Sequence, residues 1–509
     1  MRPFHPSTWP TAVWILLPLA VGLLYALGYA ALAPKPTVAD LPPVDAILVE
    51  RFKDLQALDR ASFGPRGAGV RATREMIAAN RNVRGLPGVD PTRPIHMILM
   101  PRTTRPDSTI AVFPVEDAGA FEGEFKRSDF IERDLTRNAQ HLVVRGGWAA
   151  VAPNRDDARR IGTGGITAAE LGEDQAIAAR IPALVEHALS LARNYPWNTL
   201  LPALGVQVDA LYTRTDDAGA AVPVLAGDER LDLIRRTWAE GRMWTWFDPG
   251  RVRIELLPQR GTLAERIASV HAAGPSVEGE GAPPYAPSGA EIELRIAGKG
   301  AVGLTAHLLR TCGVPFTIPG DDPLGGLGVI DPDASSLLVW AEPARNSNHA
   351  ITIGLAARAL PDLTAYLPLP ADGEEVPLPS DRAWPTLGTS IEGLAAPRGT
   401  VARAKAKGGL DLLVFGAGAR GVAEGMRSSL AAGLGGAPGS GASGRGAAPP
   451  VDEGHVVLAA FLVRADRARL LLGRALKPGG FLAALADADI RGRLTTDGRS
   501  VRLEAWATR

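Results

Sequence analysis

The sequence MWTWFDPGRVRIELL, at residues 243–257, contains two runs of alternating apolar and polar residues on either side of an Asp-Pro-Gly triplet. Such a triplet between alternating runs is typical of a tight turn joining two antiparallel strands. The end of the chain repeats the pattern, because IRGRLTTDGRSVRLEAW, at residues 490–506, alternates around Asp497-Gly498. An Asp-Gly pair in that setting is a strong hairpin signal. A β-hairpin is therefore predicted at 243–257 and another at the end of the chain.

Further similarities between the two halves follow one another in the same order. TIAVFPVEDAGAFEGEF (109–125) and LDLLVFGAGARGVAEGM (410–426) share Val-Phe and Glu-Gly at equal spacing, and VRIEL (252–256) resembles VRLEA (501–505). Each match alone is at the level of chance, but their common order suggests an ancient duplication. The duplication predicts that each hairpin closes its own sheet. It also predicts three superpositions: Val112 on Val414, His141 on His455, and Val252 on Val501.

The predicted fold class is α+β, with an N-terminal single transmembrane helix followed by two α/β modules related by the duplication. Each module is expected to have a mostly antiparallel sheet with helices on one face. The predicted divisions are a short cytoplasmic tail (1–8), a transmembrane signal anchor (9–33), a Pro-rich stalk (34–43), a first extracytoplasmic module with a helical insertion (44–273), a linker (274–290), and a second module (291–509) with a disordered loop (435–450).

Local patterns predict the elements of these modules. Alternating or β-branched runs predict strands at 95–100, 108–115, 141–144, 148–152, 291–296, 336–342, 349–357 and 410–415, with helices after the strands at 108–115 and 410–415. Apolar residues recurring every three to four positions predict an amphipathic helix over 44–58. The capping-box sequence Thr167-Ala-Ala-Glu170 predicts a second helix, whose apolar stripe runs from Ile177 to Leu191.

The predicted anchor, Trp9 to Ala33, has no Asp, Glu, Lys or Arg, and its aromatic residues lie toward its ends. A run of roughly 20 apolar residues spans the hydrocarbon core of a bilayer. The alternatives are a cleaved signal peptide ending at Ala33 and a buried apolar helix. The run is too long for the signal peptide, and Pro34 would follow the cut. A very short leading tail favours export, which predicts a bacterial inner-membrane protein with the bulk of the chain outside the cytoplasm.

Composition limits the classes of function. The chain has 509 residues and a formal net charge of zero, which argues against nucleic acid as a partner. Cys312 is the only cysteine, so neither an internal disulfide nor a cysteine-based metal site can form. The histidines show no metal-ligand spacing, and the acids near the glycines of 320–333 are interpreted as polar turns rather than a Ca²⁺ site. No metal is therefore predicted.

One motif resembles a dinucleotide-binding turn. Gly416-Ala-Gly418-Ala-Arg-Gly421 forms a GxGxxG between an apolar strand and a helix. The acidic residue expected about 20 positions later, at the end of a second strand, is missing. The first acids there are Asp452 and Glu453, which follow a Gly/Ser/Pro-rich stretch. We interpret the motif as a structural turn and predict no cofactor.

The aromatic residues of the first hairpin are the candidate ligand-binding residues: Trp238, Met243, Trp244, Trp246 and Phe247. Trp244 and Trp246 share a face of their strand and could form a platform for a sugar or an acyl chain, although aromatic residues also fill cores. The leading hypothesis is a membrane-anchored binding or structural protein without a recognisable catalytic site, which binds a protein partner or an apolar ligand. The alternatives are a hydrolase-like enzyme whose acidic site forms only in the fold, and a carrier that uses the aromatic platform.

Overall fold

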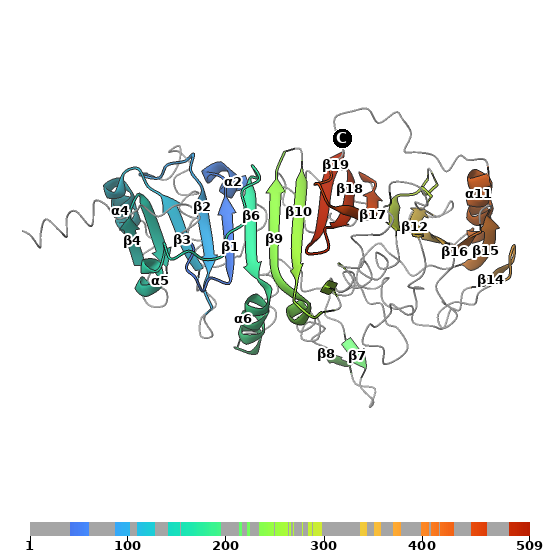
Figure 1. The fold of residues 1–509 in the computed structure, drawn as a ribbon, viewed down its shortest axis with the longest axis horizontal. Coiled ribbons are helices and arrows are strands. Elements are labelled where there is room, and N and C mark those ends of the chain that lie inside the picture. Colours follow the sequence, from blue (N-terminus) through green and yellow to red (C-terminus); the bar gives the residue numbers. More distant parts are fainter. Residues whose placement is uncertain are drawn as a thin grey trace, which may run out of the picture.

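The computed structural model contains one large antiparallel β-sheet, shown in Figure 1. The structure describes residues 41–60, 87–101, 109–127, 141–152, 154–194, 213–215, 221–223, 234–248, 250–262, 264–265, 268, 277, 284–287, 289–297, 336–343, 351–357, 370–377, 399–406, 409–416, 418–431, 449–465 and 488–508.

The sheet takes strands from the whole length of the chain. The first half contributes β1 (Leu48–Phe52), β2 (Ile95–Leu99), β3 (Thr109–Pro114), β4 (His141–Arg145), β5 (Trp148–Ala152), β6 (Gln175–Arg180), β9 (Trp238–Trp246) and β10 (Arg251–Pro258). The second half contributes β11 (Ile292–Ala297), β12 (Ser336–Pro343), β13 (Ile351–Ala357), β14 (Glu375–Pro377), β15 (Thr400–Ala406), β16 (Leu410–Gly416), β17 (Val456–Val463), β18 (Asp489–Thr496) and β19 (Val501–Thr508). Strands β7 (Thr213–Thr215) and β8 (Ala221–Pro223) form a separate small sheet.

Both halves arrange their strands in the same order. From the outer edge inward, the first half runs β4-β5-β3-β2-β1-β6-β9-β10, and every pairing is antiparallel. The second half runs β15-β16-β13-β12-β11-β17-β18-β19, again antiparallel, with β14 added outside β15. Apart from β14, strands counted along the chain therefore lie fourth, fifth, third, second, first, sixth, seventh and eighth in each half.

The two halves meet where β10 pairs with β19, which makes a single 17-stranded sheet. Ile254 stands opposite Leu503, and the pairs on either side of it are Arg253 opposite Glu504 and Glu255 opposite Arg502. An Arg–Glu pair therefore lies on each side of the Ile254–Leu503 pair, and the two pairs run in opposite directions across the ladder. This register places a pseudo-twofold axis at the Ile254–Leu503 pair, like the isologous interface of a symmetric dimer.

The two faces of the sheet bury different clusters. On one face, apolar side chains continue across the junction, because Val252 packs against the cluster around Phe52 and Phe113, and Leu256 packs against the cluster around Ile296. On the other face, apolar clusters cover only the outer parts of the two halves. Between those outer clusters lie charged side chains of β9, β10, β19 and β18, which are described below.

Helices cover the apolar parts of both faces. The helices are α2 (Leu55–Arg60), α4 (Ala118–Arg127), α5 (Arg155–Arg159), α6 (Ile181–Asn194) and α11 (Ala419–Ala431). On the face with charged residues at its centre, α5 adds Ala158 to the first half's cluster and α11 adds Ala423 and Met426 to that of the second half. These two helices follow the fifth strand of their respective halves, so the repeat includes a helix as well as the strands.

The predicted fold class is wrong, because the body is one continuous antiparallel sheet rather than two α/β modules that each close their own sheet. Among the described residues, no helix combines the length and the apolar character needed to cross a bilayer. Residues 1–40, which include the predicted tail and anchor, lie outside the described residues, as do most of the linker (274–290) and residues 435–448 of the predicted loop.

Two predicted helices are wrong for one physical reason. Leu48–Phe52 is strand β1, which pairs with β2 and β6, and the helix is limited to Leu55–Arg60. Gln175–Arg180 is strand β6, and α6 begins only at Ile181. Both strands lie inside the sheet and are covered on both faces, so their sequences lack the clean alternation of a half-exposed strand. The hairpins and the other predicted strands are confirmed.

Of the three superpositions predicted from the duplication, one is confirmed and two are wrong. VRIEL in β10 and VRLEA in β19 occupy equivalent places, and Val252 and Val501 are related by the pseudo-twofold axis. Val112 lies in β3 whereas Val414 lies in β16, whose equivalent in the first half is β5. His141 begins β4 whereas His455 precedes β17, so that pair is also not equivalent.

Glycines opposite large aromatic residues define the packing of the second half. A Cβ atom added to Gly354 would lie 2.0 Å from Cζ2 of Trp340, its partner on β12, and a Cβ on Gly492 would lie 2.1 Å from Cζ of Phe461. Each ring therefore lies over a glycine on the neighbouring strand. Glycine is required there because of the close approach of the ring, not because of the backbone conformation.

Gly354→Ala is predicted to lower the free energy of unfolding by about 1–3 kcal/mol, because the fully buried Trp340 ring cannot move away without cost. The matched control is Gly425→Ala in α11, where the added methyl meets no atom within 4 Å. In a helix this change is expected to stabilise by up to about 1 kcal/mol. Urea unfolding monitored by circular dichroism measures both, and an unchanged or higher midpoint for Gly354→Ala would contradict the packing described.

Candidate functional site

The charged side chains at the junction lie on one face of the sheet, which we call the central face. It is formed by β9, β10, β19 and β18. The pairing register places Trp244, Arg253, Glu504 and Arg493 side by side in one row across these strands, and Arg242, Glu255 and Arg502 in the next. Directly opposite residues of adjacent strands point to the same face, so the members of each row are neighbours. The central face is therefore lined by alternating arginines and glutamates.

These residues form two similar Arg–Glu–Arg groups, one on each side of the pseudo-twofold axis. In the first group, Arg493 Nε donates to Glu504 at 2.9 Å and Arg253 Nε donates to the other oxygen of the same carboxylate at 2.5 Å. In the second, Arg502 Nε donates to Glu255 at 2.7 Å, and Arg242 Nη1 lies 3.8 Å from the other oxygen. Each carboxylate is thus held by an arginine from its own half and by one from the other half.

The equivalence of Arg242 and Arg493 is also visible in the sequence. Gly241-Arg242 in β9 corresponds to Gly492-Arg493 in β18. Val252 follows Arg242 by ten positions, whereas Val501 follows Arg493 by eight, so the second hairpin is two residues shorter around its turn. This difference leaves the arginine and the glutamate on the same face in both halves, because an even number of residues preserves the alternation of a strand.

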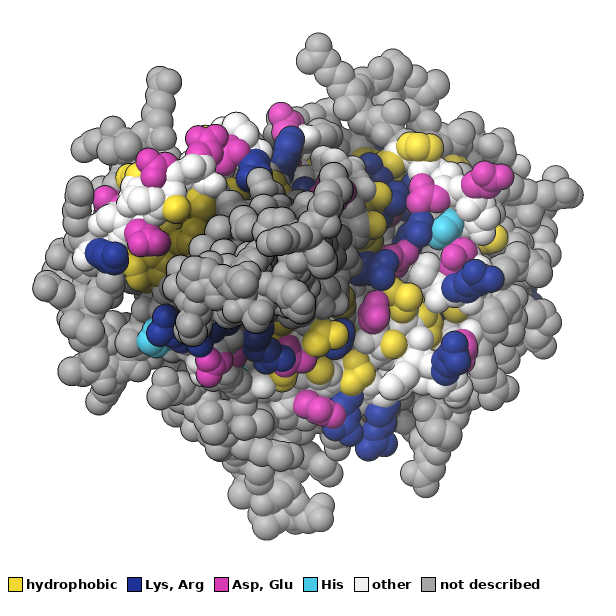
Figure 2. Space-filling model, turned by 60° about the vertical axis from the view of Figure 1, so that its left-hand side comes forward, with side chains coloured by type: hydrophobic (Ala, Val, Ile, Leu, Met, Phe, Trp, Pro, Cys, Tyr) yellow, Lys and Arg dark blue, Asp and Glu magenta, His cyan; other side chains and the backbone are white. Residues whose placement is uncertain are grey.

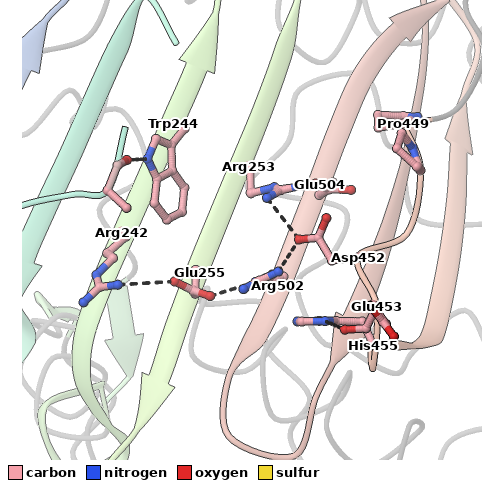
Figure 3. Close-up of polar contacts among 12 residues, drawn as sticks. Arg242, Trp244, Arg253, Glu255, Pro449, Asp452, Glu453, His455, Arg502 and Glu504 are labelled. Atoms are coloured by element: carbon pink, nitrogen blue, oxygen red, sulfur yellow. Dashed lines mark hydrogen bonds and ion pairs between the residues drawn. The ribbon is translucent and has the colours of Figure 1, made fainter. Parts of the chain in front are cut away.

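One acidic residue joins the two groups. Asp452, in the segment before β17, accepts hydrogen bonds through Oδ2 from Arg502 at 2.5 Å and from Arg253 at 3.3 Å. Figure 3 shows the resulting chain of contacts, which runs from Arg242 through Glu255, Arg502, Asp452 and Arg253. Arg253 and Arg502 are related by the pseudo-twofold axis, so we call them the axial arginine pair. A single carboxylate lies between them.

Glu504 is the most highly coordinated carboxylate of the central face. It is only 3% exposed and contacts Arg251, Arg253 and Arg493. Burial alone would raise the pKa of Glu504, but Arg253 and Arg493 outweigh burial and hold the pKa below its ordinary value of 4.5. Glu504 is therefore ionised at neutral pH, and it fixes the positions of the arginines around it.

A further row beside the first group alternates aromatic and cationic residues. Trp246, Arg251, Trp506 and Arg491 stand opposite one another on β9, β10, β19 and β18. The guanidinium of Arg251 lies 4.5 Å from the centre of the Trp246 ring, a cation–π contact. This row closes one side of the central face and orients Arg251 toward Glu504, to which its Nη2 donates at 3.1 Å.

The predicted aromatic residues do not gather on one face. Trp244 and Trp246 share the central face as predicted, but Trp244 is 3% exposed and donates through Nε1 to the carbonyl of Ala169 at 2.7 Å. Trp238 and Phe247 are buried in the two clusters of the opposite face, and Met243 also points to that face. Trp246 alone keeps a partly exposed ring. Ligand binding by these residues stays a prediction.

The GxGxxG motif lies in a strand-to-helix turn. Strand β16 ends at Gly416, with φ 131°, and Gly418, with φ 76°, directly precedes α11. Both glycines adopt backbone conformations that other residues rarely take, so turn geometry accounts for these two, whereas Gly421 lies inside α11. Within the described part of the chain, no three His, Cys, Asp or Glu side chains are placed to hold a metal ion.

The arginines and glutamates of the central face were not predicted as site residues. The sequence does contain a signal for them. When VRIEL and VRLEA are aligned antiparallel, each arginine stands opposite the glutamate of the other segment. Read in the forward direction, the same similarity indicates only a duplication. The contribution of Asp452 could not be predicted, because it depends on how the segment before β17 crosses the sheet.

Charges of both signs are also mixed on the face of the molecule drawn in Figure 2. Figure 2 shows basic and acidic side chains interspersed with hydrophobic ones among the coloured residues, without a continuous patch of one sign. This agrees with the net charge of zero. Comparison of the chain with known protein families, with curated proteins and with solved structures found no match.

Glu504→Gln is predicted to lower the free energy of unfolding by about 3 kcal/mol at pH 7, because it leaves partly buried arginines without their shared carboxylate. The matched control is Glu424→Gln, which removes an exposed i,i+4 pair with Arg420 and is expected to cost about 0.5 kcal/mol or less. Urea unfolding at pH 7 measures both changes. Equal losses for the two variants would contradict the role assigned to Glu504.

The same variant has a predicted pH signature. Because folding lowers the pKa of Glu504, its stabilising contribution is complete above the ordinary value of 4.5 and is lost as the pH falls through the lower folded-state pKa. The stability difference between wild type and Glu504→Gln is therefore expected to narrow as the pH falls from about 5 to about 3. A constant or widening difference over that range would contradict the assigned direction.

Proposed function

We propose that this protein is a binding protein that recognises a carboxylate-bearing ligand or partner at the axial arginine pair of the central face. The observation that carries the proposal is the position of Asp452, whose one carboxylate oxygen accepts from Arg253 and from Arg502. These arginines come from different halves and already pair with Glu504 and Glu255 in the sheet. The axis therefore presents additional donors to one more anion, and the chain's own Asp452 shows that a carboxylate fits them.

The charge balance of the central face supports an anionic ligand. Its arginines are Arg242, Arg251, Arg253, Arg491, Arg493 and Arg502, and the acids of the same strands are Glu240, Glu255, Asp489 and Glu504. Six positive charges against four negative ones leave an excess of two, which Asp452 reduces to one. Arginine is well suited to such sites, because its planar guanidinium keeps donors available for a second acceptor and is always charged.

The sheet gives the arginine pair the rigidity that recognition requires. Arg253 is held by Glu504 and Arg502 by Glu255, both on directly opposite positions of the β10–β19 ladder. Side chains fixed in this way lose little further conformational freedom when a ligand binds. The same glutamates prevent the two arginines from turning into solvent.

The predicted alternatives are less well supported by the described residues. An enzyme with an assembled acidic site would require converging carboxyls, of which at least one has a raised pKa. Burial raises the pKa of Glu293, but its carboxylate is paired with Arg295 at 3.1 Å. Attachment to a lipid bilayer through Trp9 to Ala33, and with it a location outside the cytoplasm, stays a prediction.

Citrate, a small polycarboxylate, tests the proposal on the full chain. At low ionic strength and at ten times its Kd, citrate is expected to raise the free energy of unfolding by about 1.4 kcal/mol, because it binds only the folded state. Arg502→Gln should lose this stabilisation. The matched control, Arg420→Gln, removes an exposed arginine of α11 and should keep it. Thermal and urea unfolding with and without citrate measure the effect.

The outcome that contradicts the proposal is a citrate effect that is the same in wild type, Arg502→Gln and Arg420→Gln, or absent from all of them. Sodium chloride at matched ionic strength serves as the salt control, because screening weakens the attraction between exposed charges in every variant.

A further inference from the structure

The carboxylate between the axial arginines belongs to residues 449–455, which we call the strap. The strap leads directly into β17 and crosses the central face through acceptors only. The carbonyls of Pro449 and Pro450 accept from Arg493 Nη1 and Nη2 at 2.7 and 2.8 Å, and Asp452 accepts from the axial arginine pair. Within the described part of the chain, each hydrogen bond between the strap and the central face therefore joins an arginine donor to a strap oxygen.

The strap contributes little to the core. Val451 is 36% exposed, Asp452 has 42% of its side chain exposed, and Pro450, Glu453 and Gly454 are exposed as well. The strap thus buries little apolar surface, which is the usual source of strong attachment. Exposed ion pairs each contribute only about 0–1 kcal/mol. The strap is consequently held by polar contacts that another acceptor-rich chain could replace.

We infer that the strap is an internal substitute for an extended acidic polypeptide segment, which binds the central face in its place. This inference rests on the proposed function and specifies the class of ligand. The partner would present two backbone carbonyls to Arg493 and, two or three residues later, an Asp or Glu carboxylate to the axial arginine pair.

The pattern of contacts distinguishes a polypeptide from a small anion. A free phosphate or a single carboxylate could replace Asp452, but it would leave Arg493 without the carbonyls of Pro449 and Pro450. Arg493 is 7% exposed, so losing both acceptors would carry a desolvation penalty. An extended chain supplies carbonyl and carboxylate oxygens together, as the strap does.

Because the strap competes with a partner, the charge of Asp452 sets how tightly the partner binds the central face. The strap is covalently attached to β17, so its local concentration is high and a partner must compete with it. Neutralising Asp452 weakens the strap's contact with the axial arginines, because an amide oxygen can still accept a hydrogen bond but carries no charge. The arginines stay in place, so the weakened strap should be displaced more easily and the site should bind an acidic peptide more tightly, not less tightly.

The test measures binding of a fluorescein-labelled peptide, PPVDEGH, which has the sequence of the strap, to full-length protein by fluorescence anisotropy. Asp452→Asn is expected to bind it at least about tenfold more tightly than wild type. Glu453→Gln is the matched control, since it removes the same charge from the strap at an exposed side chain that contacts no arginine among the described residues, and it should bind like wild type. PPVNEGH should bind Asp452→Asn at least about tenfold more weakly than PPVDEGH.

A second variant locates the binding. Adding Arg502→Gln to Asp452→Asn should abolish the gain, and circular dichroism with urea unfolding checks that each variant is folded. Equal peptide affinity for wild type and Asp452→Asn, or peptide binding that survives Arg502→Gln, would overturn the inference. If Asp452→Asn gains affinity for citrate but not for the peptide, the ligand is a small anion. That result overturns the inference and leaves the proposed function intact.

Discussion

The ladder between β10 and β19 is the interaction on which the rest of the structure depends. Antiparallel pairing of two similar segments puts Arg253 opposite Glu504 and Arg502 opposite Glu255, with the apolar pair Ile254 and Leu503 between them. The segment is therefore complementary to its own repeat. Since β10 and β19 would otherwise each be the exposed edge of a half, this pairing removes two edges and joins the halves into one sheet.

The central face is a consequence of that junction. Each half supplies the glutamate and one arginine of an Arg–Glu–Arg group, and the other half supplies the second arginine. The pseudo-twofold axis brings these second arginines, Arg253 and Arg502, close to each other. Only one carboxylate can occupy a position on an axis, so only one half needs to supply it. Asp452 of the second half does so. The symmetry between the halves breaks down at this point, which is also where we propose that a ligand binds.

Local patterns were enough to predict the hairpins, most strands and the helices after β3 and β16, because alternation and turn residues act over a few positions. They failed at β1 and β6, where strands covered on both faces resemble helices in apolar spacing. They also failed for the junction. The sequence VRIEL predicts a strand with one charged face, but which strand pairs with it depends on a register between residues some 250 positions apart. The position of Asp452 is likewise set by the path of the strap.

A disulfide cross-link tests the β10–β19 register most directly. In a chain in which the single native cysteine, Cys312, is replaced by serine, Ile254→Cys and Leu503→Cys place two thiols on directly opposite residues. Their Cβ atoms should lie about 4.5–5.5 Å apart, so that an approach of about 1 Å brings them to the spacing of a disulfide. Ile254→Cys with Val501→Cys is the control, offset by two residues on the same face. Peptide mass spectrometry should find the disulfide in the first pair and little in the second. A disulfide that forms mainly in the offset pair, or in neither pair, would contradict the pseudo-twofold junction.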